Sequence, residues 1–169
     1  METLYPDNTE HNSKEAVLSA LMKVLATLNA QERLMGRGVL AVMYQNGRDV
    51  GLAEGKRLDR ADDLSTALDI IRRSTWGEVW SIELWKEKGQ SGETFEEDGK
   101  KIAWLVWREC PLRQVCLTEG VDQNGAMCRL SYGLFAGILS SVLDQRVDIM
   151  PMVTGPNACK KKVIWREKK

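Results

Sequence analysis

The sequence contains a single histidine, His11, and it stands in a polar stretch far from the other residues that commonly bind metals. One imidazole excludes every site built on paired histidines, and the sequence has no nucleophile elbow and no phosphate-binding loop. The pair Gly36 and Gly38 lacks the third glycine and the preceding strand that a dinucleotide site needs. No familiar catalytic motif is therefore found.

Long hydrophobic runs and net charge are also missing. No apolar stretch approaches the length of about 20 residues that a membrane span needs, and residues 1–12 lack the apolar segment of a signal peptide. Lys and Arg number 24, as do Asp and Glu. Without a surplus of positive charge, neither a membrane nor nucleic acid is an expected partner. We expect a cytoplasmic protein.

Charged residues do gather at two places, and neither predicts a site. The acidic segment 93–98 lacks the ligand spacing of a calcium loop, so it is interpreted as a solvated loop. The basic runs Lys160 to Lys162 and Lys168 to Lys169 are interpreted as a solubilising edge rather than a nucleic-acid patch, because the chain is neutral overall.

The chain is long enough for one domain with a hydrophobic core and short for two. It has 169 residues, of which 43% are hydrophobic and 28% charged, as in ordinary globular proteins. Residues 1–12 are polar and are expected to form a flexible tail. Residues 13–169 are expected to form the single domain.

Apolar residues at helical spacing predict helices over about 13–28, 31–45, 62–71 and 129–143. Asn46 and Gly47 are expected to end the second of them, because glycine readily adopts the positive φ of a helix end. In the fourth helix, Gly133 and Gly137 lie one turn apart and allow close approach to a neighbouring element. The connector from Cys110 to Gly120 is expected to be helical and exposed.

Bulky and β-branched residues predict strands over 79–85, 102–107, 147–153 and 162–165, with residues 88–99 as a hairpin loop. Helices come first and strands follow, with one helix between the two strand pairs. The expected fold class is α+β, with N-terminal helices packed on a roughly four-stranded antiparallel sheet and one inserted helix.

All four cysteines, Cys110, Cys116, Cys128 and Cys159, fall in the last sixty residues. In an intracellular chain such a group favours a metal site or a thiol switch over a disulfide framework. Four thiolates would satisfy zinc, and an iron–sulfur cluster is a weaker alternative. Two other interpretations stay open: buried apolar cysteines, or a reversible disulfide between Cys110 and Cys116.

Three segments near the end of the chain, Cys128 to Gly137, Val147 to Ile149 and Thr154 to Cys159, together resemble the 4-vinyl reductase domain family. The resemblance covers about residues 30–169 and is looser over the helical part. It implies an α+β module that binds a small hydrophobic ligand. The family includes sensor domains of regulators of aromatic catabolism, and trafficking-complex subunits share the fold more distantly.

The resemblance also implies a zinc site and shows where this chain departs from it. In the aromatic sensors, zinc is held by a cysteine at the start of the inserted helix, a carboxylate on the next strand and two later cysteines. Cys128, Asp148 and Cys159 match three of these ligands. The fourth position is Pro151, which cannot coordinate. Either Cys110 or Cys116 completes the site, with Asp148 as a substitute ligand, or the chain binds no metal.

Four residues are candidates to line a ligand pocket. Trp107 and Tyr132 match pocket-lining aromatics of the phenol sensors, Leu105 matches a third lining position, and Trp80 is added from the first predicted strand. An indole N–H and a phenol hydroxyl in an apolar cavity would orient a ligand with one polar group. The alternative is that these large side chains simply fill the core.

The combined prediction is a small-hydrophobic-ligand-binding or sensor module with a cysteine-based zinc or thiol site. The apolar stripe from Val17 to Leu28 suits a homodimer through the N-terminal helices. Two alternatives stay open. The chain is a reductase or hydrolase that uses a cysteine or bound metal, or it is a redox-responsive interaction protein.

Overall fold

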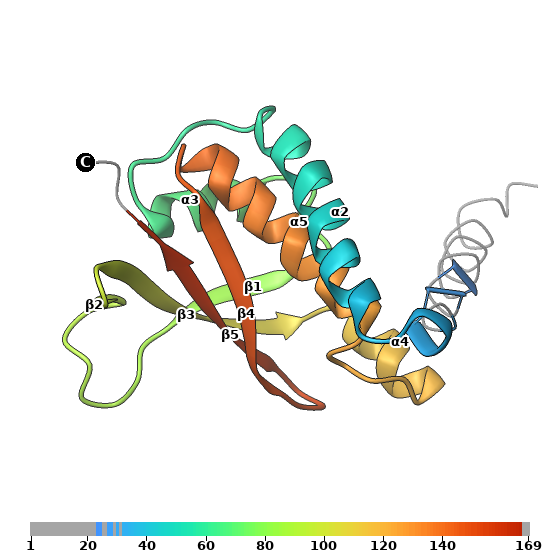
Figure 1. Ribbon diagram of the computed structural model, residues 1–169. Coiled ribbons are helices and arrows are strands. Elements are labelled where there is room, and N and C mark those ends of the chain that lie inside the picture. The colour runs from blue at the N-terminus through green and yellow to red at the C-terminus, as the bar shows by residue number, and fades with distance from the viewer. Residues whose placement is uncertain (1–22, 25–26, 29, 31, 167–169) are drawn as a thin grey trace, which may run out of the picture.

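The computed structural model describes residues 23–24, 27–28, 30 and 32–166. The predicted tail 1–12 and most of the predicted helix 13–28 lie outside these residues, so the homodimer stays a prediction. No described helix is long and apolar enough to cross a membrane. The elements follow one another in the order shown in Figure 1: α2 (Gly38–Gly55), α3 (Leu64–Arg73), β1 (Ser81–Trp85), β2 (Thr94–Glu97), β3 (Lys100–Glu109), α4 (Pro111–Glu119), α5 (Ala126–Val142), β4 (Val147–Thr154) and β5 (Cys159–Trp165).

The strands form one antiparallel sheet in the order β1-β3-β5-β4, with β2 paired to the first half of β3. The α+β prediction is confirmed, but the sheet has five strands rather than about four. The expected loop 88–99 contains β2, which turns into β3 through Asp98 and Gly99. Their φ values are 53° and 68°, the conformation that an Asp-Gly hairpin turn requires. Phe95 then packs 5.8 Å from Trp104 and holds the short strand in place.

Helix α5 lies on one face of the sheet, and α2 lies beside α5 (Figure 1). Ala103, Leu105 and Trp107 of β3 are at most 1% exposed, and they alternate with the half-buried Trp104 on the opposite face. The alternation predicted for this strand is therefore confirmed. The core is formed between these side chains and the buried face of α5, which includes Tyr132, Phe135 and Ile138.

The contact between α2 and α5 is made by glycines. A Cβ atom added at Gly51 would lie 2.0 Å from the Leu134 carbonyl oxygen, and one at Gly133 would lie 1.9 Å from the Tyr44 oxygen. The two backbones therefore touch directly. The prediction that Asn46 and Gly47 end the helix is wrong, because α2 continues to Gly55. Gly47 gives room for α5 rather than a helix end, since its Cβ would lie 2.0 Å from the Leu130 oxygen.

Strand β5 places alternate residues on opposite faces of the sheet. Lys160 and Lys162 lie on the face away from α5, where they pair with Glu87 and Glu97 and flank the Trp104 ring. Lys161 points the other way and is 0% exposed. The solubilising edge predicted for the three lysines is therefore wrong for Lys161. Strand geometry directs this side chain into the core.

Strand β4 is at the edge of the sheet, and α2 covers its outward backbone groups. Arg48 donates to the Val147 oxygen at 2.6 Å, and the Ile149 N–H donates to the Tyr44 hydroxyl at 3.1 Å. Two positions further along, Pro151 has no N–H to offer. An edge protected in this way resists pairing with another strand.

Candidate functional site

Four cysteines that are far apart in the sequence meet in one part of the core. Cys110 precedes α4, Cys116 lies within α4, Cys128 is in the first turn of α5 and Cys159 begins β5. We call these four with Tyr132 and Lys161 the buried thiol cluster. The prediction of an exposed connector is wrong, because Cys110 is 8% exposed and Cys116 is 1% exposed. The apolar face of α4 turns both inward.

Lys161 is the basic residue at the centre of the buried thiol cluster. Its Nζ donates to the Tyr132 hydroxyl at 2.7 Å and lies 4.2 Å from the centre of that ring. Burial lowers the pKa of Lys161, while the nearby Cys159, Cys128 and Cys110 sulfurs act in the opposite direction. An amine of this kind donates a strong hydrogen bond in its charged form and becomes a nucleophile in its neutral form.

Two of the thiols, Cys116 and Cys128, lie close enough to affect each other's protonation. Their interaction lowers the pKa of Cys116 and raises the pKa of Cys128. The Cys116 thiol also approaches the Asp122 oxygen at 3.8 Å. Burial raises the pKa of Cys110. Of Cys110, Cys116 and Cys128, only Cys116 has a pKa below its usual value, so it gives up its proton more readily than the other two.

The loop 121–125, between α4 and α5, covers the cluster. The Tyr132 hydroxyl lies 3.4 Å from the Gln123 carbonyl oxygen and 3.3 Å from Asn124 Oδ1. The Cys159 thiol lies 3.9 Å from Gln123 Oε1. All three distances are long for hydrogen bonds of these types. The loop is therefore held over the cluster by weak polar contacts.

An aromatic group continues from the thiol cluster along α5. Trp107 packs edge-on against Tyr132 at 5.7 Å and against Phe135 at 5.1 Å, and Trp80 meets Phe135 at 5.3 Å. The Nε1 atoms of Trp80 and Trp107 are buried and have no hydrogen-bond partner in the described part of the chain. Trp80 approaches the Cys110 sulfur without reaching the geometry of a hydrogen bond. A buried donor without an acceptor costs about 1–3 kcal/mol.

The structure brings together all four residues predicted to line a pocket. Leu105 is paired across the sheet with Lys161, and Trp107 is paired with Cys159. The sequence analysis missed Phe135 as a neighbour of these residues, and it missed Lys161 altogether. The signal for Lys161 was present, because it lies two residues from Cys159 and Val163 on one face of a strand.

The zinc site predicted from the cysteines is not seen in the described part of the chain. Across the described residues, no group of three or more Cys, His, Asp or Glu side chains is arranged to hold a metal. Lys161 lies near these thiols, and in its charged form it would repel a divalent cation. Zinc therefore stays a prediction that this arrangement does not support.

Asp148, the carboxylate proposed as a zinc ligand, belongs to a different part of the molecule. It pairs with Ile164 in the sheet, five residues from Cys159, or about 17 Å along a strand. Its carboxylate contacts Arg48 at 3.2 Å and Arg146 at 3.4 Å. These two cations already neutralise it.

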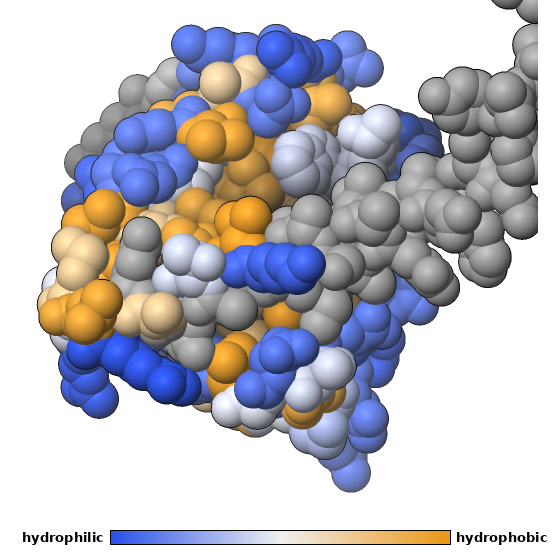
Figure 2. Space-filling model, turned by 90° about the vertical axis from the view of Figure 1, so that its right-hand side faces the viewer, coloured by the Kyte–Doolittle hydropathy of each residue, from blue (hydrophilic) through white to orange (hydrophobic). Residues whose placement is uncertain are grey.

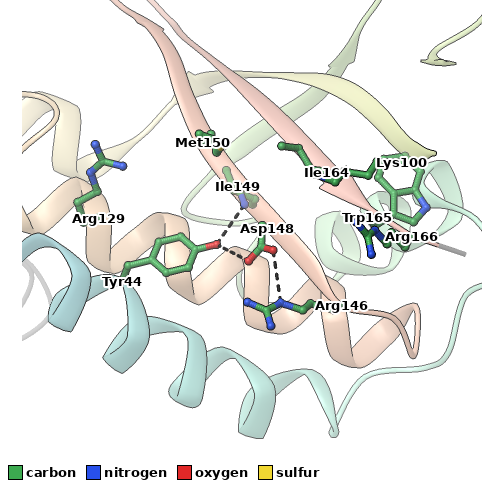
Figure 3. Close-up of a pocket in the computed structure, with 10 residues that line it drawn as sticks. All are labelled: Tyr44, Lys100, Arg129, Arg146, Asp148, Ile149, Met150, Ile164, Trp165 and Arg166. Carbon is green, nitrogen blue, oxygen red and sulfur yellow. Dashed lines mark hydrogen bonds and ion pairs between the residues drawn. The ribbon is translucent and has the colours of Figure 1, made fainter. Parts of the chain in front are cut away.

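Asp148 instead lines a cavity of about 690 Å³ at the edge of the sheet, which we call the arginine groove. Figure 3 shows Tyr44 and Arg146 directed at Asp148, with Arg129 at one end of the groove and Arg166 at the other. The groove was not predicted, because its residues come from five separate parts of the sequence. Its lining consists of Tyr44, Lys100, Arg129, Arg146, Asp148, Ile149, Met150, Ile164, Trp165 and Arg166.

Neither a family model nor a curated protein matches the sequence. Among solved structures, the chain is similar to the phenol-responsive sensory domain of the transcription activator PoxR with phenol, at 12% identity and a TM-score of 0.54 over 88% of this chain and 74% of that one. It is also similar to a trafficking protein particle complex subunit 3 from Naegleria fowleri covalently bound to palmitic acid, at 17% identity and a TM-score of 0.56 over 90% of this chain and 97% of that one. At these identities the likeness is one of fold, and it agrees with the fold that the resemblance implied.

Proposed function

We propose that the chain is a sensor-type module that binds a small, largely apolar molecule between α5 and the sheet. The ligand carries one hydrogen-bonding group and lies against the aromatic residues Trp80, Trp107 and Phe135. Its polar group faces Lys161 and Tyr132.

The observation that carries the proposal is the pair of unpartnered indole N–H groups. Trp80 and Trp107 each bury a donor with no acceptor in the described residues, and both contact Phe135. Core tryptophans normally find an acceptor. A ligand oxygen placed between them would remove a cost of about 1–3 kcal/mol for each donor.

Lys161 and Tyr132 supply the other polar contact. Their Nζ and hydroxyl groups are 2.7 Å apart, so a ligand oxygen beside them meets a cation and a hydroxyl together. Such a pair in a mostly aromatic site binds a phenol or a carboxylate and fixes its orientation.

Loop 121–125 is the proposed route of access, because Trp107 is 1% exposed and Tyr132 is 2% exposed. Opening the loop breaks the long contacts from Tyr132 to Gln123 and Asn124 and leaves α5 in place. Gly120, with φ at 63°, provides the hinge at its start.

The similar structures support this proposal, since one was solved with phenol and the other with palmitic acid covalently bound. Both molecules combine a large apolar part with one oxygen-bearing group. They are therefore the first two ligands to test.

The test measures tryptophan fluorescence and thermal unfolding while phenol or palmitate is added. In Trp107→Phe, the ring stays and the N–H is lost, so we expect about tenfold weaker binding, the value of one hydrogen bond. Trp85→Phe is the matched control, because Trp85 is 41% exposed on β1. Unchanged affinity in Trp107→Phe, or no response to either molecule, contradicts the proposal.

A redox response is a second candidate function, and two observations favour it: Cys116 and Cys128 lie in one buried cluster, and their interaction lowers the pKa of Cys116. The Cys116 thiolate attacks a disulfide such as oxidised glutathione and releases one glutathione thiol. The Cys128 thiol then displaces the second glutathione. The protein loses two hydrogen atoms and gains one S–S bond between α4 and α5.

Intact mass and peptide mapping after treatment with oxidised glutathione test this second function. We expect a loss of two hydrogens and a Cys116–Cys128 peptide, absent in Cys116→Ser and retained in Cys110→Ser. Mapping that finds a different pair, or a mass that does not change, rules this disulfide out.

A further inference from the structure

The arginine groove is separate from the buried thiol cluster and has a different chemistry. We propose that it binds a small organic anion, one with a phosphate or carboxylate group attached to a flat apolar part. This inference does not depend on the ligand proposed for the interior.

Charge is the first argument. The chain is neutral overall, yet the groove is lined by Lys100, Arg129, Arg146 and Arg166 with Asp148 as its single carboxylate. Asp148 is already paired with Arg146 and with Arg48. Three cations in the lining therefore have no acidic partner among the described residues, and a concave wall concentrates their field.

Arg129 provides the most specific feature. Its Nε is buried and makes no hydrogen bond within the described part of the chain. No acceptor among the described residues holds the guanidinium at this nitrogen, and the half-buried side chain lines the groove, so we propose that it turns its N–H groups to a phosphate or carboxylate oxygen. Figure 3 shows that Arg129 stands at the end of the groove opposite Arg166.

The floor of the groove is apolar, which separates this site from a simple surface patch of charge. Ile149, Met150, Ile164 and Trp165 line it between the cations. A fully solvated ion such as phosphate alone gains nothing from these side chains. Ile149 and Trp165 are already buried, but Met150 is 51% exposed and Ile164 is half-buried. A ligand with a flat apolar part covers these two and gains about 25 cal/mol for each Å² removed from water.

The size of the groove selects a small molecule. Its volume of about 690 Å³ lies within the usual range for ligand sites. A second hollow of about 500 Å³ shares Tyr44, Arg129, Arg146 and Asp148 with it and adds Arg37 and Arg48. The anionic end of the ligand therefore has cations on two sides at the Arg129 end. Figure 2 shows one face of the molecule, on which hydrophobic residues are bordered by hydrophilic ones.

The experiment compares 1-naphthyl phosphate with uncharged 1-naphthol and with inorganic phosphate, by calorimetry on the full chain. We expect 1-naphthyl phosphate to bind at least tenfold more tightly than either fragment, and its affinity to fall as salt is added. Equal binding of 1-naphthol shows that charge is not recognised and overturns the proposal. Tighter binding of a single-stranded oligonucleotide also overturns it, because the occupant is then a nucleic acid.

Variants locate the binding. Arg129→Gln and Arg166→Gln should each weaken binding of 1-naphthyl phosphate about tenfold. Arg73→Gln is the control, because it removes an exposed cation from α3, away from the groove. Arg166 is exposed and follows β5, so we expect Arg166→Gln to fold normally. This variant therefore tests the groove even if Arg129→Gln folds poorly. Equal losses in Arg73→Gln and Arg166→Gln overturn the proposal.

Trp107→Phe should leave the affinity for 1-naphthyl phosphate unchanged. This variant therefore distinguishes failure of the groove proposal from failure of the proposed interior site.

Discussion

The two faces of α5 are built on opposite principles. On the face toward α2, the backbones of the two helices touch at Gly133 and Gly137, with no side chain between them at these two positions. The face toward the sheet carries the largest side chains of the helix, Tyr132 and Phe135, together with Cys128. The face toward α2 has no room for a Cβ atom at these glycines, while the face toward the sheet buries polar groups.

We interpret the face of α5 toward α2 as the one that contributes stability, and the face toward the sheet as the one that carries the candidate site. Backbone-to-backbone packing leaves no donor or acceptor free and has a single good arrangement. The sheet face leaves two indole N–H groups without acceptors and encloses an ammonium group among thiols. Natural proteins retain such unfavourable groups mainly at functional sites. We therefore expect substitutions on the two faces to change stability in opposite directions.

The largest effect is expected at the glycine face. In Gly133→Ala the new Cβ would lie 1.9 Å from the Tyr44 oxygen, so the helices must separate. We expect a loss of about 3 kcal/mol in the free energy of unfolding, measured by urea denaturation. The matched control is Gly38→Ala on α2, where nothing lies within 4 Å of the added atom. Alanine is the better helix former, so that variant should gain up to about 1 kcal/mol. Similar losses in both variants would show that the contact is looser than described.

The second prediction concerns the sheet face and has the opposite sign. Lys161→Met removes a buried cation and keeps the length of the side chain, while the Tyr132 hydroxyl keeps its Gln123 and Asn124 acceptors. We expect stability to rise by about 1–3 kcal/mol and binding of the ligand proposed for the interior to be lost. A variant that is less stable at neutral pH would show that Lys161 is a structural requirement.

The gain in Lys161→Met should depend on pH. Burial lowers the pKa of Lys161 below its usual 10.5, so over that range the unfolded chain binds more protons than the folded one. The folded protein bears the full cost of the charge below the folded pKa, and the cost disappears as pH rises toward 10.5. The difference between variant and parent should therefore be largest near neutral pH and shrink above it. Denaturation curves at several pH values measure this.

The spacing of apolar residues was enough to predict most helices and strands. The predictions failed where the same residue type can serve two structural roles. The residues around Gly47 look the same whether this glycine ends a helix or makes room for a neighbouring helix. Only the position of α5 in the structure shows that it makes room. Asp98 and Gly99 are a hairpin signal, but they stand in a segment so rich in Glu, Asp and Gly that it was interpreted as a loop.

The candidate sites could be predicted only in part, for a similar reason. Cysteine content and the family resemblance indicated the residues that meet around Tyr132. They did not single out Lys161, because three consecutive lysines suggest a solvated edge, and its spacing from Cys159 and Val163 becomes informative only when the strand is known to begin at Cys159. The arginine groove was beyond prediction, since Arg129 and Arg166 become neighbours of one cavity only through the sheet.

A third prediction concerns Ser140, which joins the two faces at the end of α5. Its hydroxyl accepts from the buried Val147 N–H at 2.9 Å and donates to the Ala136 oxygen at 2.6 Å, and Arg48 of α2 reaches it at 3.2 Å. Ser140→Ala leaves a buried N–H without its acceptor, so we expect a loss of about 1–2 kcal/mol. Hydrogen exchange should show faster exchange at Val147 and little change in β3. A uniform increase across the sheet would instead mean that Ser140 acts on the whole fold.

The smallest effect is expected outside both faces, at the start of α3. Asp63 caps this helix by accepting from the Thr66 N–H and hydroxyl, each at 2.9 Å. The Thr66 backbone hydrogen bond lowers the pKa of Asp63 below its usual 3.8, so its contribution is present above that pH and is lost as pH falls through the lowered pKa. Asp63→Ala should cost about 1 kcal/mol at pH 7, and Asp63→Asn clearly less, because asparagine caps as well as aspartate does. Urea denaturation at pH 7 and pH 3 checks this, and neither variant should alter binding at the interior site or the groove. A loss of binding in either variant would show that α3 is coupled to the sites and that the two faces of α5 do not act alone.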